Sequence, residues 1–187
     1  MNVILASESP RRKDLLKLIY PEFQIIPAFI DESLPDDIGS EFAPLFLAAA
    51  KADMVAESHP DELIIAADTV VVLDGKIYGK PHNTEDAKRI LNILSGKTHK
   101  VITGCSIVLN ERCVTFSEES YVSFYPLSNE DIEAYVNSGE PLGKAGAYAI
   151  QGKGALLVKS IDGDYNNIVG LPVSRLNQEL KAFLNEK

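Results

Sequence analysis

The sequence predicts an α/β fold built on a mixed β-sheet, and three features support this prediction. A short apolar run at residues 3–5 leads through two serines into a proline-started helix signal. Residues 63–73 form an unbroken apolar run rich in β-branched side chains, which is typical of a buried central strand. Two strand patterns at residues 101–109 and 114–125 are separated by a short turn, so the sheet contains a hairpin as well.

The elements up to the central strand follow from local signals. A second strand is predicted at residues 23–26, and an alanine-rich helix at about residues 42–58. Pro44 obscures the first turn of that helix, because proline lacks the N–H group that the helix interior needs. The central strand at residues 63–73 ends at Asp74-Gly75, which is a typical hairpin turn.

The second half of the chain alternates helices and strands. After the hairpin we predict a helix from Thr84 to about Ser95, the two strands joined at Asn110, a helix capped by Ser128, and a last helix after Pro172. Asp131 completes a capping box with Ser128. The segment 138–172 is dense in glycine, which either lets the backbone approach a ligand closely or makes a set of sharp turns.

The composition limits the partners of the chain. Its 187 residues suffice for one full core, and we expect a single domain over residues 1–187. There are 18 Lys and Arg against 27 Asp and Glu, a net charge of −9, which argues against a nucleic-acid polymer or an anionic membrane as the main partner. Neither a secretory signal pattern nor a membrane-length apolar run is evident, so we expect a cytoplasmic protein. Cys105 and Cys113 lack metal-ligand spacing and are expected to be packing residues.

Residues 3–15 predict a phosphate-binding site. Ser9 can cap a helix that starts at Pro10, where unpaired N–H groups carry partial positive charge. Arg11 and Arg12 add guanidinium donors, and Ser7 adds a hydroxyl. The alternative is an ordinary cap with solvated arginines. The helix dipole disfavours arginine at this end unless an anion compensates it, which favours the phosphate site.

Asp68 is the strongest catalytic candidate. A carboxylate inside an apolar strand loses solvation, and such groups are often functional; the alternative is a structural acid that pairs with a buried lysine or caps backbone groups. Glu32 lies on an acidic loop and is relevant if it folds back towards Asp68, where two carboxylates would suit Mg²⁺ or Mn²⁺. Lys51 and Lys80 could each be ordinary surface lysines, although Lys80 lies in a rigid Gly-Lys-Pro turn.

Other polar residues are less informative. Gln151 is notable in the glycine-dense segment, because its amide can both donate and accept and so suits the edge of a base. His59, His82 and His99 show no metal-ligand spacing and are expected to be surface or supporting side chains.

Several motifs together resemble a known family. They lie at residues 5–12 (LASESPRR), 67–71 (ADTVV), 79–81 (GKP), 95–101 (SGKTHKV), 144–152 (KAGAYAIQG) and 167–172 (NIVGLP). This combination resembles the Maf family of nucleoside triphosphate pyrophosphatases. The resemblance implies an elongated mixed-sheet α/β fold, related to inosine triphosphate pyrophosphatases, with two lobes around a central cleft. It also implies hydrolysis of a nucleoside triphosphate to the monophosphate and pyrophosphate with Mg²⁺ or Mn²⁺, which clears non-standard nucleotides.

The resemblance also suggests roles for individual residues. By position, Asp68 matches the family's proton acceptor and shares metal binding with Glu32. The other matches to residues that handle the phosphates are Ser7, Arg11, Arg12, Lys51 and Lys80. Thr69 and Gln151, together with Arg11, match positions used for substrate choice and resemble the branch that acts on dTTP, UTP and modified uridine triphosphates. Glu8 departs from the expected small residue and places a negative charge beside the phosphate site.

Two further expectations rest on the resemblance alone. One is a homodimer. The other is an alternative function, a nucleotide-binding regulator of cell division and septum formation with little turnover. A pure sensor has no need of a buried general base, so an intact Asp68 counts against this alternative.

Overall fold

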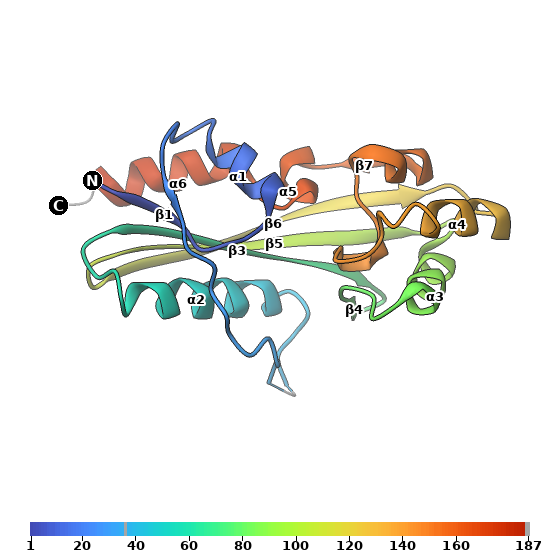
Figure 1. The fold of residues 1–187 in the computed structure, drawn as a ribbon, viewed down its shortest axis with the longest axis horizontal. Coiled ribbons are helices and arrows are strands. Elements are labelled where there is room, and N and C mark those ends of the chain that lie inside the picture. The colour runs from blue at the N-terminus through green and yellow to red at the C-terminus, as the bar shows by residue number, and fades with distance from the viewer. Residues whose placement is uncertain (36, 186–187) are drawn as a thin grey trace. The chain divides into compact units, whose positions relative to one another are not determined.

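A mixed seven-stranded sheet runs through the protein, in a computed structural model that describes residues 1–35 and 37–185 (Figure 1). The strands are β1 (Val3–Leu5), β2 (Gln24–Ile25), β3 (Leu63–Leu73), β4 (Lys76–Tyr78), β5 (Thr98–Leu109), β6 (Arg112–Phe124) and β7 (Val158–Asp162). The strand order is β2-β1-β3-β5-β6-β7, with β4 paired to β3. Strands β1 and β2 and strands β1 and β3 pair in parallel, whereas the β3/β4 and β6/β7 pairs are antiparallel, so the predicted mixed α/β fold is confirmed.

Helices of two kinds connect these strands. The α-helices are α1 (Pro10–Leu16), α2 (Ala43–Ala56), α3 (Thr84–Leu94), α4 (Asn129–Val136), α5 (Tyr165–Val169) and α6 (Val173–Asn185). Two 3₁₀ helices, η1 (Ala145–Ala147) and η2 (Gly152–Leu157), lie in the glycine-dense segment. Among the described residues, no helix is both long and apolar enough to cross a membrane.

The chain divides into two compact units. Unit 1 contains Met1–Asp68, Thr103–Glu118 and Gly170–Lys187, and unit 2 contains Thr69–Ile102 and Glu119–Val169. The division falls inside strands β3, β5 and β6. The expectation of a single domain stays a prediction.

Alternating side chains build the core of unit 1. Leu63, Ile65 and Ala67 of β3 pack with residues of α1 and α6, among them Leu16 and Leu176. The residues between them, Ile64 and Ala66, pack instead with Ala52 and Val55 of α2. This alternation follows from the two-residue period of a strand. Figure 1 shows the same arrangement, with α1 and α6 on one face of these strands and α2 on the other.

Unit 2 has its own apolar cluster and a layer of short helices. Val70, Val72 and Ile102 pack together with Ile77 of β4. Helix α3 packs against α4 and η1. The hairpin between β3 and β4 turns at Asp74 and Gly75, which both have positive φ, as the Asp-Gly signal predicts.

Most predicted elements are confirmed. Ser9 caps α1 and Pro10 is its first residue; the capping box of Ser128 and Asp131 is also present. Strand β7 was not predicted. It is an edge strand with mostly exposed residues, so it lacks the apolar alternation that identifies a strand.

The structure decides between the two expectations for His99 and overturns the one for Cys113. His99 is a supporting side chain and not a surface one, because β5 begins at Thr98 and draws His99 into the sheet, where it is buried. There its ring lies edge-on to Phe124 and Tyr148, with ring centroids 4.9 and 5.3 Å away. Cys113 is exposed and not a packing residue, because its neighbour Val114 takes the core-facing position of β6.

Candidate active site

A lysine joined to two carboxylates forms the centre of the candidate site in unit 1. Lys51 Nζ lies 2.6 Å from Asp68 Oδ1 and 2.8 Å from Glu32 Oε1. The side chains of Lys51 and Asp68 are only 11% and 13% exposed, whereas Glu32 is 46% exposed. Both predicted carboxylates therefore contact the ammonium group of the predicted lysine. The contact between Asp68 and Lys51 is also what a structural acid paired with a buried lysine would show.

The strand period explains why Asp68 meets Lys51. Asp68 continues the series of Ile64 and Ala66, whose side chains face α2. On α2, Lys51 lies one helical turn before Val55, which packs on that same face of the strand. The Lys51 stem is thus buried beside apolar groups while its ammonium reaches the carboxylate at the end of the series.

Arg12 and Ser7 form a second part of the site in unit 1. Arg12 Nε donates to the carbonyl oxygen of Gly170 at 2.8 Å, and Nη1 donates to Ser7 Oγ at 3.3 Å. Ser7 Oγ also accepts from the backbone N–H of Ser9 at 3.3 Å. Arg12 is thereby fixed between Ser7, which follows β1, and Gly170, which lies three residues before the start of α6.

Burial and charge act on Arg12 in opposite directions. Desolvation lowers the pKa of Arg12 below its usual value, while the charge of Asp68 and, more weakly, that of Glu32 raises it. An arginine remains protonated in either case. Arg12 therefore brings a permanent positive charge that interacts with both carboxylates. Arg11, half-buried on the first turn of α1, adds a second guanidinium to this helix.

The remaining predicted residues belong to unit 2. Thr69 follows Asp68 on β3 and is half-buried. Lys80 is exposed just after β4, and its turn is anchored where Gly146 N donates to Gly79 O at 3.1 Å. Gln151 is exposed between η1 and η2.

The sequence did not identify three residues that support these side chains. Gly170 provides the carbonyl group that binds Arg12. Glu140 and Tyr135 bind the backbone around Gln151. The only sequence signal for Glu140 is the Gly-Lys-Gly motif that follows Gln151, whose backbone N–H groups suit an anion.

The carboxylate pair fits a divalent cation in chemistry and in number. Mg²⁺ and Mn²⁺ prefer oxygen ligands, and Mg²⁺ is commonly held by one or two carboxylates together with substrate phosphates. Glu32 and Asp68 reach the same ammonium group, so their oxygens lie close together. Among the described residues, no group of three or more His, Cys, Asp or Glu side chains is placed to hold a metal ion.

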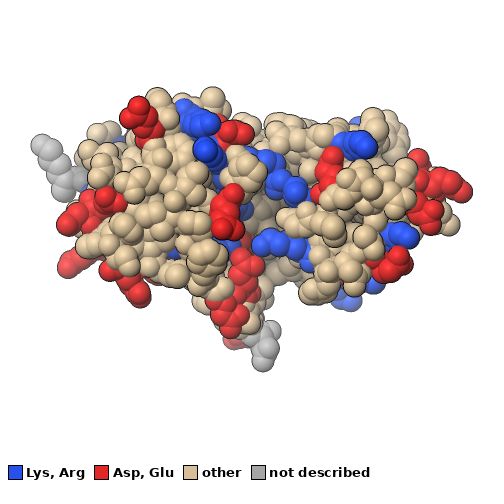
Figure 2. Space-filling view, viewed as in Figure 1, with Lys and Arg blue, Asp and Glu red and all other residues tan. Residues whose placement is uncertain are grey.

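The surface carries separate patches of both charges and not one large patch of a single sign. The face of the molecule in Figure 2 carries patches of Asp and Glu as well as patches of Lys and Arg. With a net charge of −9, an anionic substrate depends on local groups such as Arg12 and Lys51.

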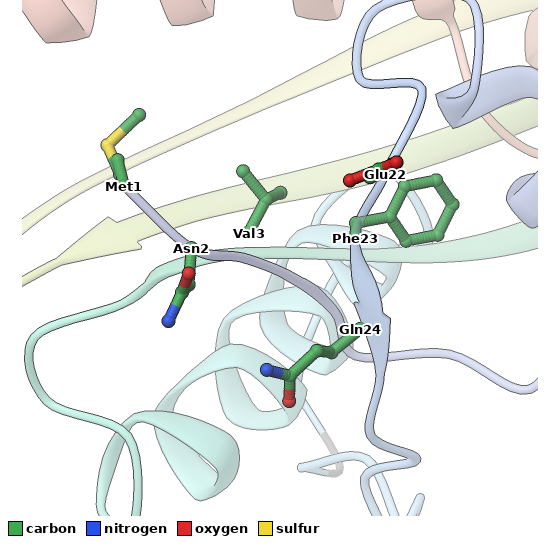
Figure 3. A pocket seen from close by; sticks show the side chains of 6 residues that line it. All are labelled: Met1, Asn2, Val3, Glu22, Phe23 and Gln24. Carbon is green, nitrogen blue, oxygen red and sulfur yellow. The ribbon is translucent and has the colours of Figure 1, made fainter.

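A pocket lies apart from the predicted residues of unit 1. It is a hollow of about 340 Å³ beside β1 and β2 (Figure 3). Its lining residues are Met1, Asn2, Val3, Glu22, Phe23 and Gln24. None of them is a predicted site residue, so the pocket is not part of the candidate active site.

Comparisons with known proteins agree with the motifs. A protein of Bacillus mycoides (strain KBAB4) named dTTP/UTP pyrophosphatase is 48% identical over 181 residues, covering 97% of this chain and 95% of that protein. A protein of the same name from Bacillus cereus (strain B4264) is 47% identical with the same coverage. The solved structure of a HAM1 protein from Coxiella burnetii has a similar fold, with a TM-score of 0.54 and 15% identity, and the match covers 97% of this chain and 99% of that one. The model of the family described as Maf-like protein matches residues 2–183, and the chain belongs to this family.

Proposed function

We propose that this chain is a dTTP/UTP pyrophosphatase, which hydrolyses the triphosphate to the monophosphate and pyrophosphate. The observation that carries the proposal is the Lys51 ammonium group bound by Asp68 and Glu32, in a chain nearly half identical to proteins with that name. The carboxylates supply a base and hard oxygen ligands, and the lysine supplies positive charge.

Asp68 is the proposed proton acceptor. A water molecule attacks the α-phosphorus, its proton passes to Asp68, and the bond from the α-phosphorus to the oxygen that bridges to the β-phosphorus breaks. Lys51 binds Oδ1, so we assign the proton to Oδ2. The electron pair of the broken bond leaves on pyrophosphate.

Cationic groups stabilise the charge that builds up on the phosphate oxygens. Lys51 and Arg12 are held in place by neighbours before substrate arrives, so little reorganisation is needed in the transition state. We assign Ser7, Arg11 and Lys80 to the same phosphates. Glu32 and Asp68 would hold Mg²⁺ or Mn²⁺, which would draw charge from the phosphates as a Lewis acid.

We assign the choice of base to Thr69 and Gln151. The exposed amide of Gln151 can pair with the donor and acceptor edge that uracil and thymine share. Uridine triphosphates modified away from that edge should also be substrates.

A product assay tests the function directly. The protein is incubated with Mg²⁺ or Mn²⁺ and, separately, dTTP, UTP, CTP, GTP, 7-methyl-GTP and pseudouridine triphosphate, and pyrophosphate and orthophosphate are measured apart. Pyrophosphate from dTTP and UTP is the expected result. Orthophosphate instead would mean a phosphatase, and binding without turnover would favour a regulatory protein.

Substitution of Asp68 tests the mechanism. Asp68→Asn should lower kcat at least about a hundredfold, as loss of a general base does, while the fold stays intact. Asp53→Asn is the matched control, since Asp53 is an exposed carboxylate on the helix that carries Lys51. An Asp68→Asn protein with the wild-type rate would rule out the assigned role.

The resemblance to the family leads to two further proposals. The protein forms a homodimer, and it works in the cytoplasm to remove non-standard nucleotides. Light scattering during gel filtration tests the first, and cell fractionation tests the second.

A further inference from the structure

The backbone on both sides of Gln151 is bound by one pair of side chains in unit 2. Glu140 accepts hydrogen bonds from the backbone N–H of Gly154 to Oε1 at 2.8 Å and of Lys153 to Oε2 at 3.0 Å. The Tyr135 hydroxyl donates to Glu140 Oε1 at 3.0 Å and accepts from the backbone N–H of Ala149 at 3.0 Å. The pair therefore fixes the chain just before and just after Gln151.

Two glycines let the loop close around the Glu140 carboxylate. A Cβ atom on Gly154 would overlap the carbonyl oxygen of Ala149 and lie 2.7 Å from the Tyr135 hydroxyl. A Cβ atom on Gly152, which has φ of 72°, would lie 2.7 Å from Glu140 Oε2. The glycine-rich loop thus approaches a carboxylate of its own chain, and the backbone N–H groups of Lys153 and Gly154 are used there.

Gln151 itself takes no part in this network. It is exposed, its backbone is extended, and its side chain makes no capping hydrogen bond to η2. Upstream, Tyr148 is buried, and its hydroxyl group lies 2.8 Å from His99 Nε2. Gln151 is consequently an accessible amide on a backbone held from both sides.

We propose that Tyr135 and Glu140 are positioning residues that set the orientation of Gln151 and, through it, the preference for uracil over cytosine. This inference rests on the proposed function, because it needs Gln151 to read the base. An amide distinguishes the two bases only if its donor and acceptor are aligned with the base edge, and a displacement of about 1 Å is enough to lose that alignment.

The test compares selectivity rather than rate alone. kcat/KM is measured for UTP and CTP in the wild type, Tyr135→Phe, Glu140→Ala and Gln151→Ala, and in the double variant Tyr135→Phe/Gln151→Ala. Tyr135→Phe keeps the buried ring and removes only the hydroxyl group, so it should still fold. Ser128→Ala is the control, because it removes the cap of α4, the helix that carries Tyr135, without touching the loop.

The expected result is a fall of about tenfold in the UTP-to-CTP ratio in Tyr135→Phe and Glu140→Ala, similar to that in Gln151→Ala. The double variant should show little further change, since both substitutions act through one residue. Glu140→Gln, which keeps an acceptor oxygen, should restore part of the ratio, and Ser128→Ala should keep the wild-type value.

A second measurement needs no substrate. Amide hydrogen exchange at Ala149, Lys153 and Gly154 should be slow in the wild type and at least about tenfold faster at Lys153 and Gly154 in Glu140→Ala. Unchanged exchange would overturn the inference. The inference would also be overturned if Tyr135→Phe and Glu140→Ala kept the wild-type UTP-to-CTP ratio while Gln151→Ala lost it. In that case the proposed function stands. If the wild-type protein releases no pyrophosphate, the proposed function is overturned, and this inference with it.

Discussion

Lys51 and Asp68 form an ion pair between a helix and a strand, with 2.6 Å between Nζ and Oδ1. Both side chains are nearly buried, so water screens their charges weakly. Glu32 adds a second carboxylate from a more exposed loop. Catalytic chemistry and folding stability therefore depend on the same charges.

Replacing Lys51 should impair both stability and turnover. Lys51→Met leaves the Asp68 carboxylate without its cation in a mostly buried place, and we expect a loss of about 3 kcal/mol in the free energy of unfolding. Turnover of UTP should fall as well, because the phosphates lose a preorganised charge. Urea denaturation followed by circular dichroism measures the first effect, and pyrophosphate release measures the second.

A double substitution separates the pair from its members. Lys51→Met/Asp68→Asn removes both charges, so its loss of stability should be smaller than the sum of the two single losses. Lys13→Met, at an exposed position of α1, is the control for removal of a lysine. Wild-type stability in Lys51→Met would show that the ion pair contributes nothing to the fold.

Replacing Arg12 with lysine should impair both substrate binding and stability. Arg12→Lys keeps the positive charge, but it cannot donate to Gly170 O and to Ser7 Oγ together as the guanidinium does. We expect KM for UTP to rise about tenfold and the free energy of unfolding to fall by about 1 kcal/mol. Steady-state kinetics and urea denaturation provide the two values. Equal KM values in the two proteins would mean that charge alone is sufficient at this position.

How much of the site the sequence could predict depends on how far apart in the chain the contacting residues lie. The apolar run of β3 predicts a buried strand, and its two-residue period puts Asp68 on the face of Ile64 and Ala66. For Asp68 as a structural acid, the sequence suggests a buried lysine or a backbone group as the partner. Which lysine it would be could not be read from the pattern, because Lys51 reaches Asp68 through the packing of α2 on that face.

The support of Gln151 lay beyond sequence patterns for a different reason. Tyr135 fits the buried face of a helix whether or not its hydroxyl group is used, and Glu140 resembles any loop acid. Their roles come from backbone groups that only the folded loop brings together. Whether His99 is a surface or a supporting side chain could not be decided from the sequence for a related reason, since its burial depends on the register at which β5 begins.

Acid should weaken the loop that Glu140 holds. Desolvation opposes ionisation of Glu140, but hydrogen bonds from Gly154, Lys153 and Tyr135 outweigh it and lower the pKa of Glu140 below its usual 4.5. A lowered pKa in the folded state stabilises the protein above about pH 4.5, and this stabilisation is lost as pH falls through the folded value.

A comparison with Glu140→Gln isolates this effect. Asp31, Asp86 and Asp131 also have lowered pKa values, so acid weakens the wild type at several places. The difference in the free energy of unfolding between wild type and Glu140→Gln should be greatest near pH 7 and shrink below about pH 4.5. Urea denaturation at a series of pH values measures it. A difference that stays constant down to pH 3 would contradict the role given to the carboxylate's charge.

Gly104 should be required for steric reasons where β5 meets the start of α2. A Cβ atom there would overlap the backbone of Pro44 and Leu45. Gly104→Ala must therefore push α2 away from the strand, and we expect a loss of about 3 kcal/mol in the free energy of unfolding. Because α2 carries Lys51, turnover of UTP should fall too.

Gly79→Ala is the matched control, since a Cβ atom there meets nothing within 4 Å, and its stability should stay within about 0.5 kcal/mol of the wild type. Equal stability of the two variants would mean that α2 can shift without cost, and that Lys51 is held by its ion pairs and not by the packing of its helix.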